Sequence, residues 1–170
     1  MYKHILIPTD GSDLSQKAID HGTKLAKALN AKVTTVTVSE PFHIFTLVQK
    51  MIDTPEGYKR RMDAVSAEYL KAAKDIAAAA GVTCDGLHVE HEHPYEAIID
   101  TARKTGCDAI LMASHGRRGI SAIVLGSETV KVLTHCNIPV VVIRASANRR
   151  STHSPAMKTR PNPPDFVLSL

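Results

Sequence analysis

Apolar residues follow two spacings along the chain, and segments with the two spacings alternate. Short runs rich in apolar and β-branched residues predict strands, whereas apolar residues recurring every three or four positions predict helices that bury one face. The first pattern predicts strands over residues 4–8, 32–38, 82–91, 108–113 and 138–143. The second predicts helices over residues 14–29, 54–80, 94–104 and 127–135. Most of the stretch 39–54 follows neither pattern.

This alternation predicts an α/β fold with a single open, doubly wound sheet of five parallel strands and helices on both faces. Strands joined by helices of this length need right-handed parallel crossovers. The run over residues 108–113 is apolar almost throughout, as expected for a strand buried on both faces. Ligands of such folds bind beyond the carboxyl ends of the strands, where the strand order reverses. The segments after the first and fourth predicted strands are therefore the candidates for a site.

The first of these segments runs Thr9-Asp10-Gly11-Ser12 and directly follows Pro8. An aspartate at this place has two uses. Its carboxylate can accept hydrogen bonds from a base amine or a ribose hydroxyl in the crevice. Alternatively, Asp10 or Ser12 can accept them from backbone amides, as a helix cap or an Asx-turn. The residues alone leave both interpretations open.

The second segment is a glycine-rich loop with Gly116, Gly119 and Gly126, and it ends in Gly126-Ser127 at the start of a predicted helix. Glycines let backbone amides approach a ligand closely, and a helix N-terminus offers free amides and a positive dipole end to a phosphate. The Walker A pattern GxxxxGK[ST] and the dinucleotide fingerprint GxGxxG are both absent. The loop therefore indicates phosphate binding by its position and not by a standard motif.

Three stretches of the chain are similar to those of a known family. They are the run from His4 to Ser12, the sequence HPYEAI at residues 93–98, and the block DAILMASHGRRGISAIVLGSETVKVLTHCNIPVVVIR at residues 108–144. Together they make residues 2–144 resemble the universal stress proteins. Nucleotide-binding members carry the loop pattern Gly-x2-Gly-x9-Gly-Ser/Thr. Gly116, Gly126 and Ser127 match it, whereas Ala113 stands at the place of its first glycine.

The resemblance implies a fold, a ligand and an assembly. The fold is a five-stranded parallel sheet of order 3-2-1-4-5, like that of the adenine nucleotide alpha hydrolases. The ligand is an adenine nucleotide, ATP with or without Mg²⁺, in the crevice between the first and fourth strands. The assembly is a homodimer that pairs the last strand, from Pro139 to Ile143, with its copy, and an exposed β-branched edge strand is a physical reason to expect such a partner. The implied phosphate and ribose contacts are Gly116, Gly126, Ser127 and Thr129 beside Ala113, and the implied adenine contacts are Pro8, Thr9, Asp10, Val38 and Met112.

Two functions fit this resemblance. In the first, the chain is a cytoplasmic stress-response protein that binds an adenine nucleotide and acts as a nucleotide-dependent regulatory module on a protein partner. In the second, it is a member of the non-binding branch, a dimeric interaction protein with an empty crevice. Ala113 is the feature that separates the two. We expect no catalytic residues, and any hydrolysis of the nucleotide to be slow and incidental.

Charge and composition exclude other classes. Residues 1–144 hold 17 Lys and Arg against 16 Asp and Glu, so the net charge of +4 lies mostly in the tail, residues 145–170. This basic, Pro- and Ser-rich tail is expected to be disordered beside a single domain over residues 1–144. With 4% aromatic residues, the chain lacks the stacking platforms of nucleic-acid binders. No apolar run is long enough for a membrane span, and no signal peptide is evident, so a cytoplasmic location is the default.

Histidines and cysteines give no strong metal signal. His88, His91 and His93 lie close together, but a zinc site usually adds a convergent third ligand such as Glu90. The three cysteines are widely spaced, which is typical of reduced thiols. We therefore expect no metal site.

Overall fold

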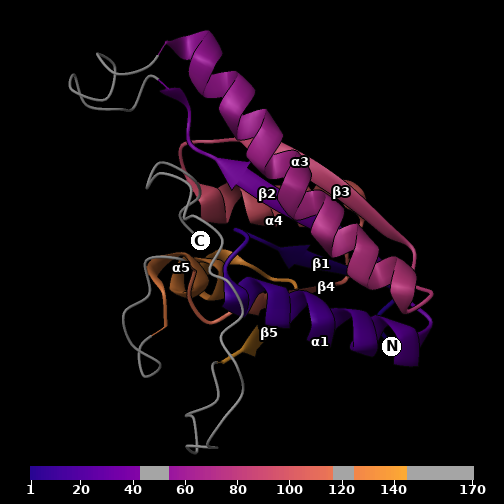
Figure 1. The fold of residues 1–170 in the computed structure, drawn as a ribbon. Coiled ribbons are helices and arrows are strands. Elements are labelled where there is room, and N and C mark those ends of the chain that lie inside the picture. Colours follow the sequence, from indigo (N-terminus) through magenta and orange to yellow (C-terminus); the bar gives the residue numbers. More distant parts are fainter. Residues whose placement is uncertain (43–53, 117–124, 145–170) are drawn as a thin grey trace, which may run out of the picture.

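The computed structural model describes residues 1–42, 54–116 and 125–144 (Figure 1). In these parts of the chain five parallel strands form one sheet of order β3-β2-β1-β4-β5, which confirms the expected fold class and order. The strands are β1 (His4–Pro8), β2 (Lys32–Ser39), β3 (Cys84–Glu90), β4 (Ala109–Ala113) and β5 (Val140–Ile143). The helices are α1 (Asp13–Leu29), α3 (Pro55–Ala79), α4 (Pro94–Thr105) and α5 (Ser127–His135).

Some sequence predictions fall outside the described residues. These are the irregular stretch from 43 to 53, the loop from 117 to 124 with Gly119, and the tail from 145 to 170. Among the helices of the described parts, none has a stretch long and apolar enough to cross a membrane.

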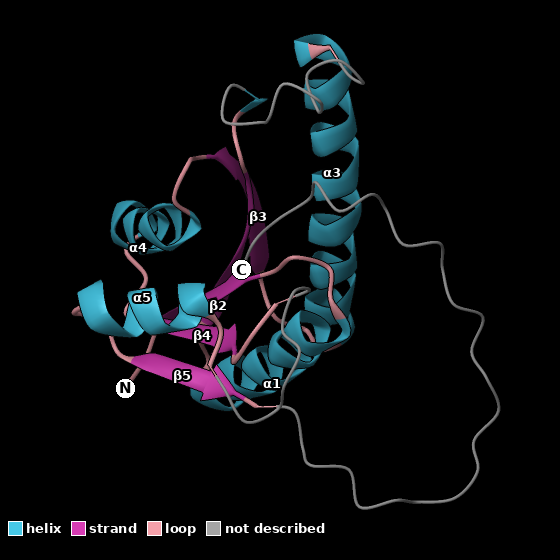
Figure 2. Cartoon of the chain, turned by 90° about the vertical axis from the view of Figure 1, so that its left-hand side faces the viewer, coloured by secondary structure: helices cyan, strands magenta, loops and turns pink. Residues whose placement is uncertain are grey.

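The helices cover the two faces of the sheet. Figure 2 shows α1 and α3 on one side and α4 and α5 on the other. Successive residues of a strand point to opposite faces, so each strand feeds two apolar clusters. Leu6, Ile110 and Met112 pack in the cluster that contains Ile98 of α4 and Val132 of α5. The other cluster lies against α1 and contains, among others, Ile5, Ile7, Ala18, Leu111 and Ala113.

Local chemistry explains where the helices begin and end. Ser12 accepts a hydrogen bond from the Ser15 amide and caps α1, and the Thr54 hydroxyl does the same for the Gly57 amide in α3. Asn30 ends α1 in the left-handed region at φ 52°, and Gly106 ends α4 at φ 70°. Asn and Gly adopt this conformation most readily, so both helix ends follow from the sequence.

Three strands begin later than predicted: β4 by one residue, and β3 and β5 by two residues each. Val82 donates its amide to the Ala77 carbonyl, so it closes α3 and β3 starts only at Cys84. The Pro139 carbonyl accepts a hydrogen bond from the Ile110 amide. Because Pro139 has no N–H to donate to β4, β5 starts at Val140.

The register of the sheet positions the candidate segments. Strands β1 and β4 are parallel neighbours, with Ile5 beside Ala109 and Leu6 beside Ile110. Their carboxyl ends therefore lie at the same edge. The turn after Pro8 and the loop after Ala113 leave the sheet side by side.

Candidate functional site

The turn between β1 and α1 is held by buried hydroxyl groups. The Thr9 amide donates to the Val36 carbonyl at 2.9 Å, which extends the pairing of β1 with β2 by one residue. The Thr37 hydroxyl donates to the Thr9 carbonyl at 3.0 Å, and the Thr9 hydroxyl lies 3.2 Å from that of Ser15. These bonds give the turn a single defined conformation, because its buried polar groups find partners in β2 and α1.

Asp10 serves the turn itself. Its Oδ1 accepts a hydrogen bond from the Ser12 amide at 3.0 Å, and its side chain is 0% exposed. Of the two interpretations that the sequence left open, the structure shows the Asx-turn, with Ser12 as the cap of α1. A ligand contact of Asp10 stays a prediction.

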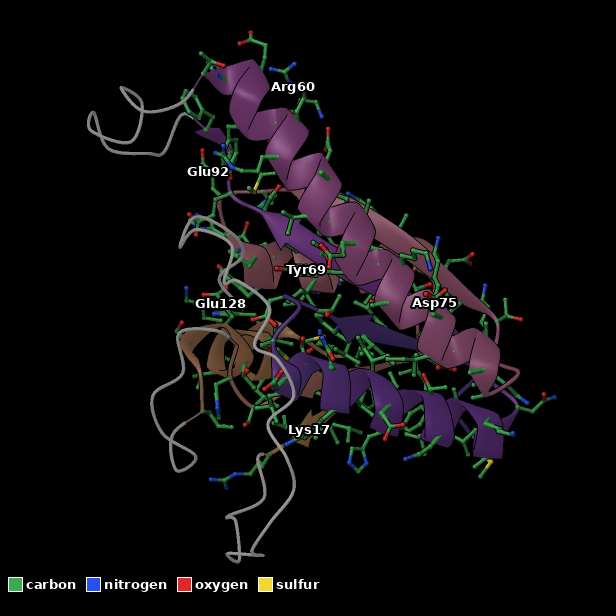
Figure 3. All side chains as sticks on the ribbon, in the orientation of Figure 1. Lys17, Arg60, Tyr69, Asp75, Glu92 and Glu128 are labelled. Atoms are coloured by element: carbon green, nitrogen blue, oxygen red, sulfur yellow. The ribbon has the colours of Figure 1, made fainter. Side chains whose placement is uncertain are left out.

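Position 11 requires a glycine for two reasons, its backbone conformation and the lack of room for a Cβ atom. Its φ of +76° lies in the left-handed region, and a Cβ there would lie 2.3 Å from the ring of Tyr69. Tyr69 of α3 thus packs directly against the turn (Figure 3). The spacing of apolar residues does not predict this contact of Tyr69, because it depends on the approach of α3 to the turn before α1.

The start of α5 lies against the backbone that follows β4. The Gly126 amide donates to the Ser114 carbonyl at 2.8 Å, and a Cβ on Gly126 would lie 3.2 Å from the His115 Cα. The Thr129 hydroxyl, 1% exposed, donates to the Ala113 carbonyl at 3.1 Å. The structure therefore brings together Ala113, Gly126, Ser127 and Thr129, with Gly116 as the last described residue before the loop.

The N-terminus of α5 differs from the other described helix starts. Ser12 caps α1, Thr54 caps α3, and the Glu128 carboxylate accepts from the Tyr95 amide in the first turn of α4. Within the described parts of the chain, no side chain accepts a hydrogen bond from the first turn of α5. Ser127, its first residue, is exposed. The backbone amides of this turn and the positive end of the helix dipole are groups that can bind an anion.

The methyl group of Ala113 points away from this helix start. Ala113 belongs to the apolar cluster on the α1 side of the sheet, together with Leu111 and Ile143, and it is 9% exposed. The methyl group that Ala113 adds relative to the first glycine of the loop pattern therefore packs in the core.

The expected adenine contacts lie at the same edge, but their side chains are buried. Val38 and Met112 pack in the cluster on the α4 side, and Pro8 is buried at the end of β1. These residues are buried near the ends of β1, β2 and β4. A direct contact between their side chains and a base stays a prediction.

A serine, a histidine and an aspartate line up across β2, β3 and α3. Ser39 Oγ lies 2.8 Å from His88 Nε2, and His88 Nδ1 lies 3.2 Å from Asp63 Oδ1. The order is that of a nucleophile relay, but Ser39 is 1% exposed and no substrate reaches it in this conformation. Burial lowers the pKa of His88, although the charge of Asp63 opposes this effect. The arrangement ties α3 to the sheet.

The three neighbouring histidines do not converge on one point. His88 contacts Ser39 and Asp63, whereas His91 Nδ1 lies 3.0 Å from the backbone nitrogen of His93. In residues 1–42, 54–116 and 125–144 there is no group of three or more His, Cys, Asp or Glu side chains that could hold a metal ion.

Known proteins resemble this chain in sequence and in fold. The model of the universal stress protein family matches residues 1–144. Universal stress protein MJ0531 of Methanocaldococcus jannaschii is 31% identical over 151 residues, which cover 85% of this chain and 83% of the relative. The solved structure of hypothetical protein MJ0577 is 26% identical with a TM-score of 0.72, and the match covers 84% of this chain and 96% of that one.

A second solved structure, a universal stress protein in complex with cAMP, is 28% identical. Its TM-score is 0.61, and the match covers 84% of this chain and 97% of that one. The family match covers most of the chain, and the order of the strands agrees with it. The chain belongs to the universal stress protein family.

Proposed function

We propose that this chain binds an adenine nucleotide, ATP in the first place, at the edge where β1 and β4 end. The observation that carries the proposal is the first turn of α5, whose amides meet no acceptor side chain in the described residues. Gly126 lets this turn lie directly against His115, so the amides are held at the end of β4. A phosphate group has the charge and the oxygen atoms that such a turn binds.

The nature of the base is supported by a relative. The 28% identical universal stress protein was solved with cAMP, which combines an adenine, a ribose and one phosphate. In our proposal the phosphates lie on Gly116, Gly126, Ser127 and the Thr129 amide. The ribose and the base lie over Thr9 and Asp10, with the floor beneath them formed by Pro8, Val38, Met112 and Ala113.

In this proposal Mg²⁺ binds together with the phosphates of ATP. No cluster of three metal-ligating side chains exists in the described parts of the chain, so these parts supply no set of ligands for the ion. A hydrated Mg²⁺ held by phosphate oxygens needs no such set, which is how this ion commonly binds together with ATP. We assign no step to it.

We infer that the chain works as a regulatory module whose surface reports the presence of nucleotide to a protein partner. The site consists of fixed amides, hydroxyls and an apolar floor, which are groups that bind a nucleotide. We also infer a homodimer through β5, which is the last strand in the order of the described sheet. The cytoplasmic location expected from the sequence stays a prediction.

A charge placed on the first turn of α5 tests the proposal. Ser127→Asp puts a carboxylate where a phosphate would lie, and Ser127→Asn is its neutral match. The carboxylate stabilises the helix start by about 0.3–1 kcal/mol, so protein stability is unchanged or rises. We expect ATP affinity to fall roughly tenfold or more in Ser127→Asp and little in Ser127→Asn, as measured by calorimetric titration.

Adenosine provides the internal control. Because it has no phosphate, its weaker binding should be nearly the same in both variants. Equal ATP affinity in Ser127→Asp and Ser127→Asn would show that the phosphates do not lie on α5.

One observation favours the alternative, a universal stress protein that binds no nucleotide. Asp10 and Thr9 are 0% and 1% exposed, and their side chains are engaged within the turn. In this alternative the turn is a structural element only, and the protein acts through its surfaces. The two functions differ in whether the purified chain retains ATP.

A further inference from the structure

Glu128 is a buried carboxylate at the second position of α5. It is 5% exposed, and Figure 3 shows it between α4 and α5. Its Oε2 accepts a hydrogen bond from the Tyr95 amide at 2.9 Å. Its Oε1 accepts one from Lys131 Nζ at 2.8 Å.

The bond to Tyr95 completes the N-terminus of another helix. The N-cap residue of α4, His93, makes no side-chain cap hydrogen bond, and Pro94 has no N–H to satisfy. Tyr95 carries the next amide, and Glu128 reaches it across the interface between the helices. A carboxylate at this place also interacts favourably with the positive dipole end of α4.

The same carboxylate could weaken anion binding at the start of its own helix, α5. One residue after Ser127, a negative charge directed at the first turn of α5 would compete with an anion for the amides there. The Glu128 carboxylate instead faces the Tyr95 amide at the start of α4, and the ammonium group of Lys131 balances its charge. The first turn of α5 keeps its own amides for a ligand.

We propose that Glu128 is a positioning residue of the nucleotide site. It docks the start of α5 on the start of α4 and so holds the amides of residues 127–129 in the orientation that a phosphate needs. Two further bonds fix the same turn to the end of β4, from the Gly126 amide and from the Thr129 hydroxyl. This inference rests on the proposed nucleotide function.

Two substitutions separate the hydrogen bond from the charge. Glu128→Gln keeps an oxygen that can accept from the Tyr95 amide, and it loses the charge. Glu128→Ala loses both and leaves the amide of the half-buried Tyr95 without this partner. We expect ATP affinity to remain within about threefold or to increase in Glu128→Gln, and to fall about tenfold in Glu128→Ala. Adenosine affinity should change by less than the ATP affinity.

A third variant controls for general loosening of α5. Val132 is a fully buried residue of the same helix, so Val132→Ala destabilises its packing and leaves the bond between Glu128 and Tyr95 in place. We expect thermal stability to fall in Val132→Ala and ATP affinity to change less than threefold. An ATP affinity that falls equally in Val132→Ala and Glu128→Ala would overturn the proposal.

Amide hydrogen exchange of the nucleotide-free protein provides a second readout. The Tyr95 amide should be protected in the wild type and in Glu128→Gln, and exchange rapidly in Glu128→Ala. If the wild type binds ATP and Glu128→Ala binds it equally well, the role of Glu128 is wrong while the nucleotide function stands. If the wild type binds no ATP, the nucleotide function itself fails, and the positioning role fails with it.

Discussion

Thr37 and Thr129 hold the ends of two neighbouring strands in the same way. The Thr37 hydroxyl donates to the Thr9 carbonyl, and the Thr129 hydroxyl donates to the Ala113 carbonyl. Each carbonyl lies where its strand ends and would otherwise lack a partner in the sheet. Thr129 was expected from the sequence as a ligand contact. Its hydroxyl is bonded to the end of β4, and a contact between its backbone amide and a phosphate stays a prediction.

The pH dependence of stability follows from two histidines, of which His4 is buried and His88 is half-buried. Burial lowers the pKa values of His4 and His88 from their ordinary value of 6.5. Below pH 6.5 the unfolded chain therefore takes up protons more readily than the folded chain. Because stability rises with pH where the unfolded state binds more protons, these groups destabilise the fold as pH falls through this range.

Urea unfolding at a series of pH values measures this effect. We expect the free energy of unfolding to be lower at pH 5.5 than at pH 7.5, with a smaller decrease in His88→Asn. His21 is exposed on α1, so His21→Asn should retain the decrease of the wild type. An unchanged decrease in His88→Asn would contradict the assignment to His88.

At the scale of elements, spacing and caps predicted the strands and helices well. Asn30 and Gly106 are the C-caps of α1 and α4, and Gly81 follows Ala80, the C-cap of α3; each of the three has a positive φ. The roles of Glu128 and Tyr69 could not be predicted in this way, because they depend on how one helix approaches another. Spacing along the sequence describes the buried face of each helix, and it carries little information on which helices meet at that face.

The geometry of β5 gives an element-scale prediction for the dimer. The carbonyls of Pro139 and Ile143 face β4, so the backbone N–H groups of Val140 and Val142 point to the outer edge. Val142→Pro removes one outward N–H without removing a bond to β4, and a proline is tolerated on an edge strand. We expect dimers in the wild type and in the β-branched control Val142→Thr, and dimerisation roughly tenfold weaker in Val142→Pro.

Sedimentation of the full chain over a range of concentrations checks this assembly. Circular dichroism confirms that each variant is folded. A monomeric wild type, or a Val142→Pro dimer as strong as that of the wild type, would contradict pairing through β5.

For the whole molecule, the strand order explains why segments far apart in the sequence lie at one edge of the sheet. The order β3-β2-β1-β4-β5 makes β1 and β4 neighbours, so the residues that follow Pro8 and those that follow Ala113 leave the sheet at the same edge. The alternating pattern of strands and helices was enough to predict this edge. It was not enough to predict how deeply Thr9, Asp10, Val38 and Met112 would be buried, because burial depends on all the elements packed around them.

Equilibrium dialysis of the nucleotide-stripped full chain against labelled ATP tests the central claim most directly. The wild type and Ala113→Gly are measured together, because the Ala113 methyl group packs on the α1 side of the sheet. We predict saturable binding of one ATP per chain, with affinities within about threefold of each other. Retention of ATP by Ala113→Gly alone, or by neither protein, would contradict the nucleotide function.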